Sequence, residues 1–163
     1  MKQKMIKDSF FYFIITGICL LFFSCNRGEV YYQYRMIKNA QWHKNMQPGF
    51  VPDSLQTTSN QFYDISIELT NNNQYRYQNI WLLVNQSLET GVMKMDTVEI
   101  KISDENGKWL GSGVGGLHQV TYPFKQRLRL DSTKQYLIYL QQYMIDDPLN
   151  GIEKVGIKIQ ESL

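Results

Sequence analysis

The side chains that most often bind metals are few in this chain and far apart. His43 and His118 are its only histidines, and no second histidine or cysteine follows either one at ligand spacing, whereas a zinc site uses three or four such ligands. Asp146 and Asp147 precede Pro148 and offer carboxylate oxygens, but calcium takes six or more oxygen ligands. We therefore predict no metal site. Each histidine should be exposed or singly hydrogen-bonded, and the aspartates should lie in a solvated turn that begins a short helical segment.

A glycine-rich stretch, GSGVGG at residues 111–116, has the spacing of a dinucleotide-binding fingerprint. Gly111, Gly113 and Gly116 fit G-x-G-x-x-G, and Asp131 follows at about the distance of the ribose-binding acid. That fingerprint binds pyrophosphate because its last glycine opens a helix. Here the following residues are LHQVTYPF, which include β-branched residues and a proline. We expect a glycine loop between strands and no nucleotide cofactor.

No residue has the sequence surroundings of a catalytic nucleophile. No serine or cysteine stands in a nucleophile-elbow context, and the carboxylates alternate onto the expected solvent faces of strands. A nucleophile with a base, or a metal set, is what an enzyme site would need. The sequence therefore predicts a protein that is not an enzyme, with no catalytic residues, no cofactor and no small-molecule substrate.

The first 24 residues have the parts of an export signal. Lys2, Lys4 and Lys7 give a positive start, and an apolar run follows at 10–23. This run of 14 residues would form a helix about 21 Å long, short of the ~30 Å hydrocarbon core of a bilayer. A charged start, a short apolar middle and a small residue at the end are typical of a secretory signal peptide.

Ser24-Cys25, at the end of this run, resembles the cleavage site of a bacterial lipoprotein signal. In such signals the cysteine after the cut receives a diacylglycerol thioether and an acyl chain on its new amino group. The resemblance implies a signal peptide at 1–24, a lipid-anchored tether at 25–29 and membrane attachment through Cys25. The alternative is an unmodified cysteine beside a signal peptide or an N-terminal anchor helix. Cleavage would remove Cys19, so the mature chain could form no internal disulfide.

The mature chain is close to neutral. The 17 basic and 15 acidic residues of the whole chain include three lysines and one aspartate within 1–24, so cleavage leaves 14 of each sign. A nucleic-acid-binding protein would instead show a basic patch or stripe. We expect no nucleic acid partner.

Hydrophobic residues at every second position mark most of the mature chain as strands. In FYDISIEL, Tyr63, Ile65, Ile67 and Leu69 alternate with polar residues, as in a strand with one buried face. Similar alternation or a short apolar run predicts strands at 30–37, 79–85, 96–103, 127–130, 135–143 and 154–160. Many short strands with polar turns between them favour an all-β protein, with residues 30–163 as a single antiparallel β-sandwich.

The same alternation predicts the core and the connections. We expect the core to contain Ile65, Ile67, Leu82, Val84, Val98, Ile100, Ile138, Leu140, Val155 and Ile157. Asn106-Gly107 predicts a tight hairpin that joins 96–103 to KWLG at 108–111. The segment 44–60, with two prolines and few apolar residues, is expected to be a long surface loop.

Aromatic residues make up 13% of the chain, and exposed rings can stack on sugars. Much of this content is expected in the core, since aromatic residues favour strands; the candidates for burial are Tyr63, Trp81 and Tyr136. Other rings remain as exposed positions that could mediate recognition, namely Tyr31, Tyr75, Tyr77 and Tyr122. A lipid-anchored carbohydrate-binding β-sandwich is therefore an alternative function.

Three segments together resemble the GldH gliding-motility lipoproteins of the Bacteroidetes. YRYQNIWLLV at 75–84 is similar to a Y-x-Y-x-N-[LI] segment, and DTVEIKISDENGKWLGSGVGGL at 96–117 to a D-T-x-E strand followed by G-x-W-L-G-x-G. YMIDDPLNGIEKVGIKI at 143–159 is similar to M-R-x-x-P-L-x-G-I-x-x-V-G, with Ile145 in place of the usual arginine.

The resemblance implies a noncatalytic lipoprotein of the outer membrane that serves envelope machinery linked to gliding and type IX secretion. The acidic stretch that directs some lipoproteins of this phylum to the cell surface is missing after Cys25, where NRGE contains only Glu29. We therefore expect the domain to face the periplasm and to bind another envelope protein.

The leading candidate for that contact is the GKWLGSGVGG segment. Trp109 and Leu110 follow the Asn-Gly turn, and Gly111 and Gly113 would let another backbone come close. Tryptophan is enriched at binding hot spots. The alternative is that Trp109 packs into the sandwich and the glycines only permit the turn.

Lipid attachment at Cys25 can be tested by metabolic labelling with a clickable palmitate. The unmodified chain should be labelled, and Cys25→Ala should lose the label because the acceptor thiol and the processed amino terminus are both removed. Equal labelling of the two proteins would contradict attachment at Cys25.

Overall fold

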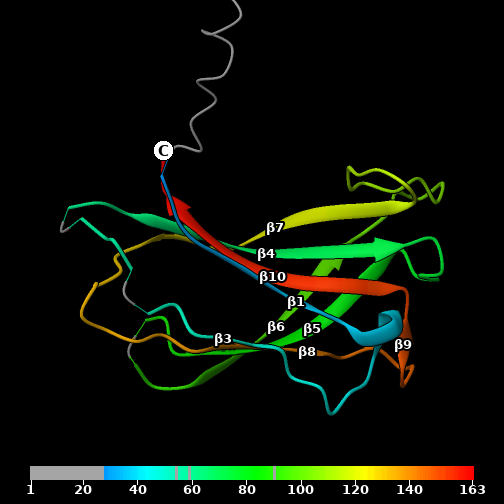
Figure 1. Cartoon of the computed structure of the whole chain (residues 1–163), viewed down its shortest axis with the longest axis horizontal. Coiled ribbons are helices and arrows are strands. Elements are labelled where there is room, and N and C mark those ends of the chain that lie inside the picture. The colour runs from blue at the N-terminus through cyan, green and yellow to red at the C-terminus, as the bar shows by residue number, and fades with distance from the viewer. Residues whose placement is uncertain (1–27, 54, 59, 90) are drawn as a thin grey trace, which may run out of the picture.

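The computed structural model describes residues 28–163, except 54, 59 and 90 (Figure 1). The predicted signal peptide at 1–24 and Cys25 lie outside the described residues. From Gly28 onward the chain forms strands joined by turns, with one short 3₁₀ turn, η1 (Lys38–Ala40). The predicted all-β class is confirmed.

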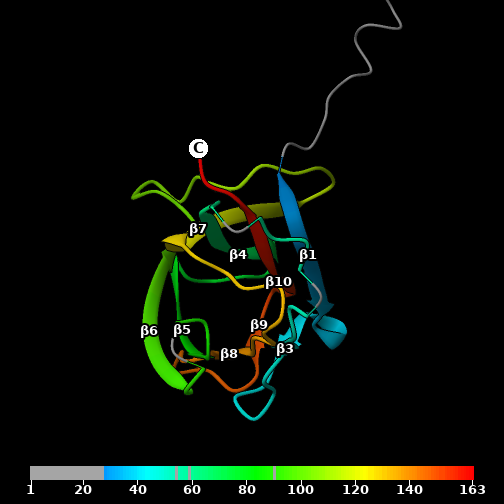
Figure 2. The same cartoon turned by 90° about the vertical axis from the view of Figure 1, so that its left-hand side faces the viewer.

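Two four-stranded antiparallel sheets make up the body of the molecule. The first sheet has the strand order β1 (Glu29–Met36), β10 (Ile152–Glu161), β4 (Tyr63–Asn72) and β7 (Leu117–Leu128). The second has the order β3 (Gly49–Phe50), β8 (Ile138–Gln142), β5 (Asn79–Gln86) and β6 (Lys94–Lys101). A short ladder joins β2 (Gln41–Trp42) to β9 (Leu149–Asn150). Figure 2 shows the sheets as two layers, with β1 and β3 on one flank and β7 and β6 on the other.

The inward-facing side chains of the two layers form one core. Nine of the ten predicted core residues are at most 1% exposed: Ile65, Ile67, Leu82, Val84, Ile100, Ile138, Leu140, Val155 and Ile157. Val98, in the edge strand β6, is only partly buried against this core. The alternation of apolar and polar residues thus predicted both the strands and the faces that they bury.

Trp81 is an exception to the predicted core. β5 is the central strand that its sequence predicts, between β8 and β6, and Ile80 and Leu82 point inward. Trp81 lies between them in sequence and is 39% exposed, because successive side chains of a strand point to opposite faces. Its predicted burial was wrong, whereas Tyr63 and Tyr136 are buried as predicted.

The sequence underestimated β7. Only a short strand at 127–130 was predicted there, yet β7 begins at Leu117 directly after the glycine loop and ends at Leu128. Pro123 is tolerated because β7 is an edge strand that pairs with β4 alone. The pairing of β7 with β4 is also irregular near Tyr63 and Ile65. The side chains of β7 therefore do not alternate regularly between the two faces of the sheet.

The predicted surface loop at 44–60 is partly a piece of the core. It contains β3, whose Phe50 is fully buried, and Leu55 is 3% exposed. Burying these two apolar side chains fixes the segment against the second sheet, where Gly49 and Phe50 pair with β8. Asp146 and Asp147 do lie in a turn, but it leads to β9 and not to the expected helical segment.

The core assignment predicts a difference between two isoleucines. Ile157→Ala should lower the free energy of unfolding by about 2–5 kcal/mol, because Ile157 is fully buried. Ile145→Ala removes the same atoms from a side chain that is 84% exposed and should cost less than about 0.5 kcal/mol. Denaturant unfolding of the full chain measures both values. Equal losses of unfolding free energy in the two variants would mean that the buried face of β10 is assigned wrongly.

Candidate functional site

The three segments behind the family resemblance come together at one end of the sandwich. This motif end holds the turn before β5, the loop between β6 and β7, and the segment 143–151. The opposite end, the terminus end, holds both ends of the described chain, where the Glu161 amide donates to the Gly28 carbonyl over 2.8 Å. Figure 1 shows the two ends on opposite sides of the molecule.

At the motif end, Tyr75 and Gly151 are in close contact. Tyr75 is 4% exposed, its hydroxyl donates to the Asn79 carbonyl over 2.6 Å, and burial raises the pKa of Tyr75 far above its ordinary value. Gly151 has a φ of +92°, and a Cβ atom there would lie 2.3 Å from the Tyr75 nitrogen. The prediction that Tyr75 is an exposed ring was therefore wrong.

Tyr77 connects the turn before β5 to the segment 143–151. Its ring packs edge-on against Tyr75, with centroids 5.9 Å apart. Its hydroxyl also interacts with Asp146, and this hydrogen bond is the largest factor that raises the pKa of Tyr77. The two tyrosines of the Y-x-Y motif thus stabilise the site and do not form an open aromatic ladder.

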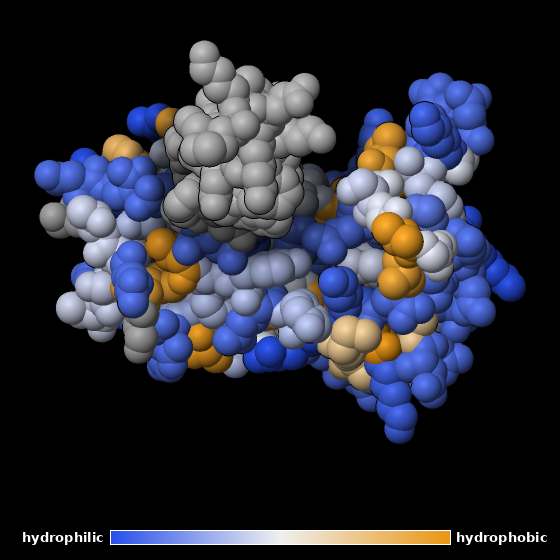
Figure 3. Space-filling model, turned by 45° about the horizontal axis from the view of Figure 1, so that its top comes forward, coloured by the Kyte–Doolittle hydropathy of each residue, from blue (hydrophilic) through white to orange (hydrophobic). Residues whose placement is uncertain are grey.

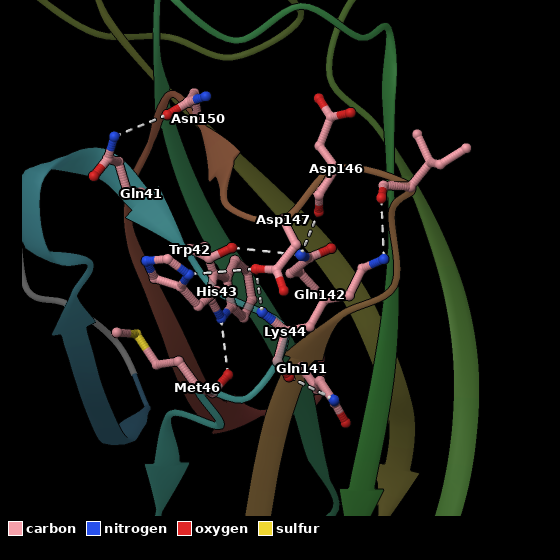
Figure 4. A network of polar contacts seen from close by, with 11 residues as sticks. Gln41, Trp42, His43, Lys44, Met46, Gln141, Gln142, Asp146, Asp147 and Asn150 are labelled. Carbon is pink, nitrogen blue, oxygen red and sulfur yellow. Dashed lines mark hydrogen bonds and ion pairs between the residues drawn. The ribbon is translucent and has the colours of Figure 1, made fainter.

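Gln142 organises the turn after β8. It is 1% exposed, and its amide group donates to the Asp146 carbonyl over 2.9 Å and to the Trp42 carbonyl over 3.4 Å. Its side-chain oxygen accepts a bond of 2.8 Å from the Met144 amide. Figure 4 shows how this network ties the turn to β2.

His43 and Asp147 lie at the surface of the same network. Their Nδ1 and Oδ1 atoms are 3.3 Å apart, and both side chains are about half exposed. The Lys44 amide donates to the same carboxylate over 3.1 Å, and Lys44 Nζ donates to the Ile145 carbonyl over 3.0 Å. The part of the chain that the structure describes contains no group of three or more histidine, cysteine or acidic residues that could hold a metal. His43 thus pairs with Asp147 at the surface.

The Asn106-Gly107 turn forms as predicted. The Asp104 amide donates to the Lys108 carbonyl over 2.9 Å, and the Leu110 amide donates to the Ile102 carbonyl over 2.9 Å. Gly107 has the positive φ of +78° that this turn requires. Only an isolated bridge, Ser103 with Trp109, continues the pairing, so KWLG does not become a strand.

The glycines after this turn lie against the chain's own β7. A Cβ atom on Gly111 would come within 2.7 Å of the Gln119 oxygen, and one on Gly113 within 1.9 Å of the Leu117 oxygen. The backbone groups of Ser112 and Gln119 exchange hydrogen bonds of 3.2 and 2.9 Å. The stretch is thus a glycine loop followed by a strand, and no helix opens to bind pyrophosphate.

Trp109 is partly buried against the core. Its ring stacks on His118 with centroids 5.1 Å apart and planes at 23°, and His118 Nε2 lies 3.0 Å from Asn73 Oδ1. The stacking fixes the hairpin against the start of β7. Trp109 therefore has a packing role in addition to its exposed area.

In the loop that follows Trp109 and at the start of β7, three aliphatic side chains face solvent. Leu110 is 56% exposed, Val114 89% and Leu117 41%. We call Trp109, Leu110, Val114 and Leu117 the hairpin surface. Figure 3 shows hydrophobic residues among hydrophilic ones at the right-hand end, where Figure 1 places this loop. The surface borders an open cleft of about 560 Å³, whose lining includes Leu110, Gln78 and Glu99.

Sequence reasoning missed a second apolar group at the motif end. The Tyr143 amide donates to the Trp81 carbonyl over 2.8 Å, so these neighbours sit side by side, and Tyr143 is 62% exposed. Ile145, at the position where the resemblance expects arginine, is 84% exposed. The apolar outer face of the 79–85 strand was the available indication.

The fold and these contacts define a single-domain antiparallel β-sandwich with an apolar, glycine-stabilised hairpin at one end. The chain belongs to the GldH lipoprotein family, whose model matches residues 29–159. It is 32% identical to a gliding motility lipoprotein GldH homolog of Christiangramia forsetii, over 96% of this chain and 98% of the relative. It is 26% identical to the gliding motility lipoprotein GldH of Flavobacterium johnsoniae, over 91% and 94%.

Membership of a lipoprotein family implies anchoring in a membrane by lipid. Within the described residues, no helix has the length and apolar character needed to cross a bilayer. Among solved structures, a chain of the Israeli acute paralysis virus particle matches with 11% identity and a TM-score of 0.30, over 82% of this chain and 69% of that one.

The close contact at Gly151 predicts that the motif end is sensitive to one methyl group. Gly151→Ala should lower the free energy of unfolding by about 3 kcal/mol or more, since it combines a positive φ with a clash against the Tyr75 backbone. Gly107→Ala is the control, because Gly107 has a similar φ but no atom within 4 Å of the added Cβ; it should cost about 1 kcal/mol. Similar losses in denaturant unfolding would show that Gly151 tolerates the added side chain.

Proposed function

We propose that this chain is a noncatalytic accessory component of the envelope machinery linked to gliding or type IX secretion. It would be anchored in the outer membrane through lipid on Cys25, face the periplasm, and act by binding another envelope protein. The supporting observation is the hairpin surface, a set of exposed apolar side chains at the end of the sandwich opposite Gly28. Lipid anchoring, family membership and the absence of a nucleophile with a base from the sequence agree with this role.

The position of Gly28 determines how the proposed lipid anchor would orient the domain. Gly28, three residues after Cys25 in the sequence, lies at the terminus end. The ten residues of β4 extend about 33 Å at ~3.3 Å per residue from that end toward the motif end. An anchor at Cys25 would therefore hold the hairpin surface away from the membrane, where a partner can reach it.

Rigidity supports the hairpin surface as the contact. The Trp109 and His118 stacking and the Ser112 and Gln119 bonds hold Leu110 and Val114 in place before any partner binds. A preorganised surface loses less conformational entropy on association. Exposed aliphatic side chains in the same loop as a partly buried tryptophan are suited to a protein partner.

The carbohydrate-binding alternative receives less support from the rings first considered for it. Tyr75 is buried, and Tyr31, Tyr77 and Tyr122 are only partly exposed. Sugar-binding surfaces need faces of rings open to solvent, whereas two of these rings pack against each other at the motif end. Those four rings therefore do not support the carbohydrate alternative, which would have to use the exposed Trp81 and Tyr143 instead.

Crosslinking and pull-down from membranes tests the proposed contact. Leu110→Asp places a charge in the hairpin surface and should reduce the recovered partner at least tenfold, as expected for a loss of about 1.4 kcal/mol or more. Met95→Asp is the matched control, because Met95 is 62% exposed on the outer edge strand β6. Both variants should keep the melting temperature within a few degrees.

Trp109→Ala measures how much Trp109 contributes to the stability of the fold. Because Trp109 stacks on His118 and packs against the core, part of its effect should appear as a lower melting temperature. If Leu110→Asp and Met95→Asp recover the partner equally, the hairpin surface is not the contact.

A further inference from the structure

The free edge of β1 differs from the other three edges of the sandwich. β7 contains Pro123 and irregular pairing, β3 has two residues, and β6 carries charged residues at four of its eight positions. These are the usual means by which proteins block edge pairing. β1 has eight residues, no proline, and regular pairing with β10 from Tyr31 to Met36.

Alternate residues of β1 bond to β10, so the backbone groups of the residues between them face the open edge. The Ile37 amide donates to the Glu153 carbonyl over 2.8 Å. Arg35 and Gln33 lie two and four residues before Ile37, opposite Val155 and Ile157. They therefore bond to β10 in the same way as Ile37. In an antiparallel pair, alternate residues bond to the neighbouring strand. The intervening residues Tyr32, Tyr34 and Met36 therefore direct their N–H and C=O groups toward the open edge, where β1 has no paired strand among the described residues. The Tyr34 carbonyl there accepts a long bond of 3.4 Å from the Arg35 guanidinium.

The side chains of the same three residues form an exposed stripe. Tyr32, Tyr34 and Met36 are 39%, 52% and 64% exposed. The two rings lie 6.5 Å apart at 55°, and Lys154 Nζ lies 4.9 Å from the centre of the Tyr34 ring. A strand added beside β1 would place alternate side chains about 5 Å from this stripe.

We propose that β1 is a docking edge for an extended segment of another protein, which adds to the first sheet as an antiparallel or parallel strand. Main-chain bonds to residues 32, 34 and 36 supply affinity, and alternate apolar side chains of the segment pack on Tyr32, Tyr34 and Met36. Lys154 and Lys158 lie opposite Met36 and Tyr32 in the register, on the face that carries the stripe. The acidic Glu68, near Tyr32 on that face, is only 5% exposed. The segment therefore carries carboxylates beside its apolar residues.

A second copy of this chain fits the edge poorly. A two-fold axis between two β1 strands pairs them antiparallel, which places the two Gly28 ends at opposite ends of a strand about 26 Å long. Two copies anchored in one membrane need both Gly28 ends on the same side. This step rests on the proposed lipid anchor at Cys25, and the mass of the crosslinked product tests it separately.

The test uses a photoreactive benzoylphenylalanine in place of Met36 in the full chain, irradiated in membranes of the producing cells. Tyr34→Pro removes one N–H at the open edge but no bond to β10, whereas Tyr34→Val keeps that N–H and loses the ring. An adduct with a different polypeptide should form, fall at least tenfold in Tyr34→Pro, and persist at half its yield or more in Tyr34→Val. That difference, and not capture alone, supports strand addition.

A second variant keeps the test valid if Tyr34→Pro fails to fold. Tyr34→Lys keeps every backbone group, adds a charge that edge strands use to block pairing, and should also lose the adduct while the melting temperature stays within a few degrees. Equal adducts in Tyr34→Pro and Tyr34→Val, an adduct of two copies of the chain, an adduct with a glycan, or no adduct would each overturn the proposal. Leu110→Asp should leave the Met36 adduct unchanged, so failure of this edge and failure of the hairpin contact are distinguishable.

Discussion

The packing of branched aliphatic side chains between the two sheets holds every other feature in place. Ile65, Ile67 and Ile157 from the first sheet meet Leu82 and Leu140 from the second within one fully buried cluster. Because side chains alternate along a strand, a slip of one residue would move each of them to solvent. A mature chain beginning at Cys25 would have no second cysteine for a disulfide, so this core would have to fix the strand register by itself.

The fixed register places different contacts at the two ends of the molecule. The terminus end joins Gly28 to Glu161 and lies next to the proposed tether. The motif end collects contacts between residues far apart in sequence, such as Tyr75 with Gly151 and Trp109 with His118. These contacts use close backbone approach and ring stacking, while Leu110 and Val114 stay exposed.

The sequence pattern predicted the strands and turns, which depend on neighbouring residues. It missed contacts between residues that are far apart in the sequence. The alternation in 63–69 identified a strand and its buried face, and Asn106-Gly107 identified a turn. The burial of Phe50 depends on a layer formed by residues more than 80 positions away, since β3 pairs with β8. Tyr75 was placed outside because its contact, Gly151, joins it only through the fold. The Cβ positions at Gly111 and Gly113 likewise show that the loop approaches its own β7, which the sequence left open.

The central claim is that the sandwich stands on the membrane by its terminus end and presents its motif end away from it. Energy transfer from a dye to a lipid acceptor at the surface of vesicles containing the lipidated chain measures this orientation directly. A donor on Glu105→Cys, in the motif-end turn, should transfer much less than one on Lys134→Cys, which follows β7 at the terminus end, because the two positions should differ in height by about 30 Å. Equal transfer from the two positions, or stronger transfer from Glu105→Cys, would contradict the account.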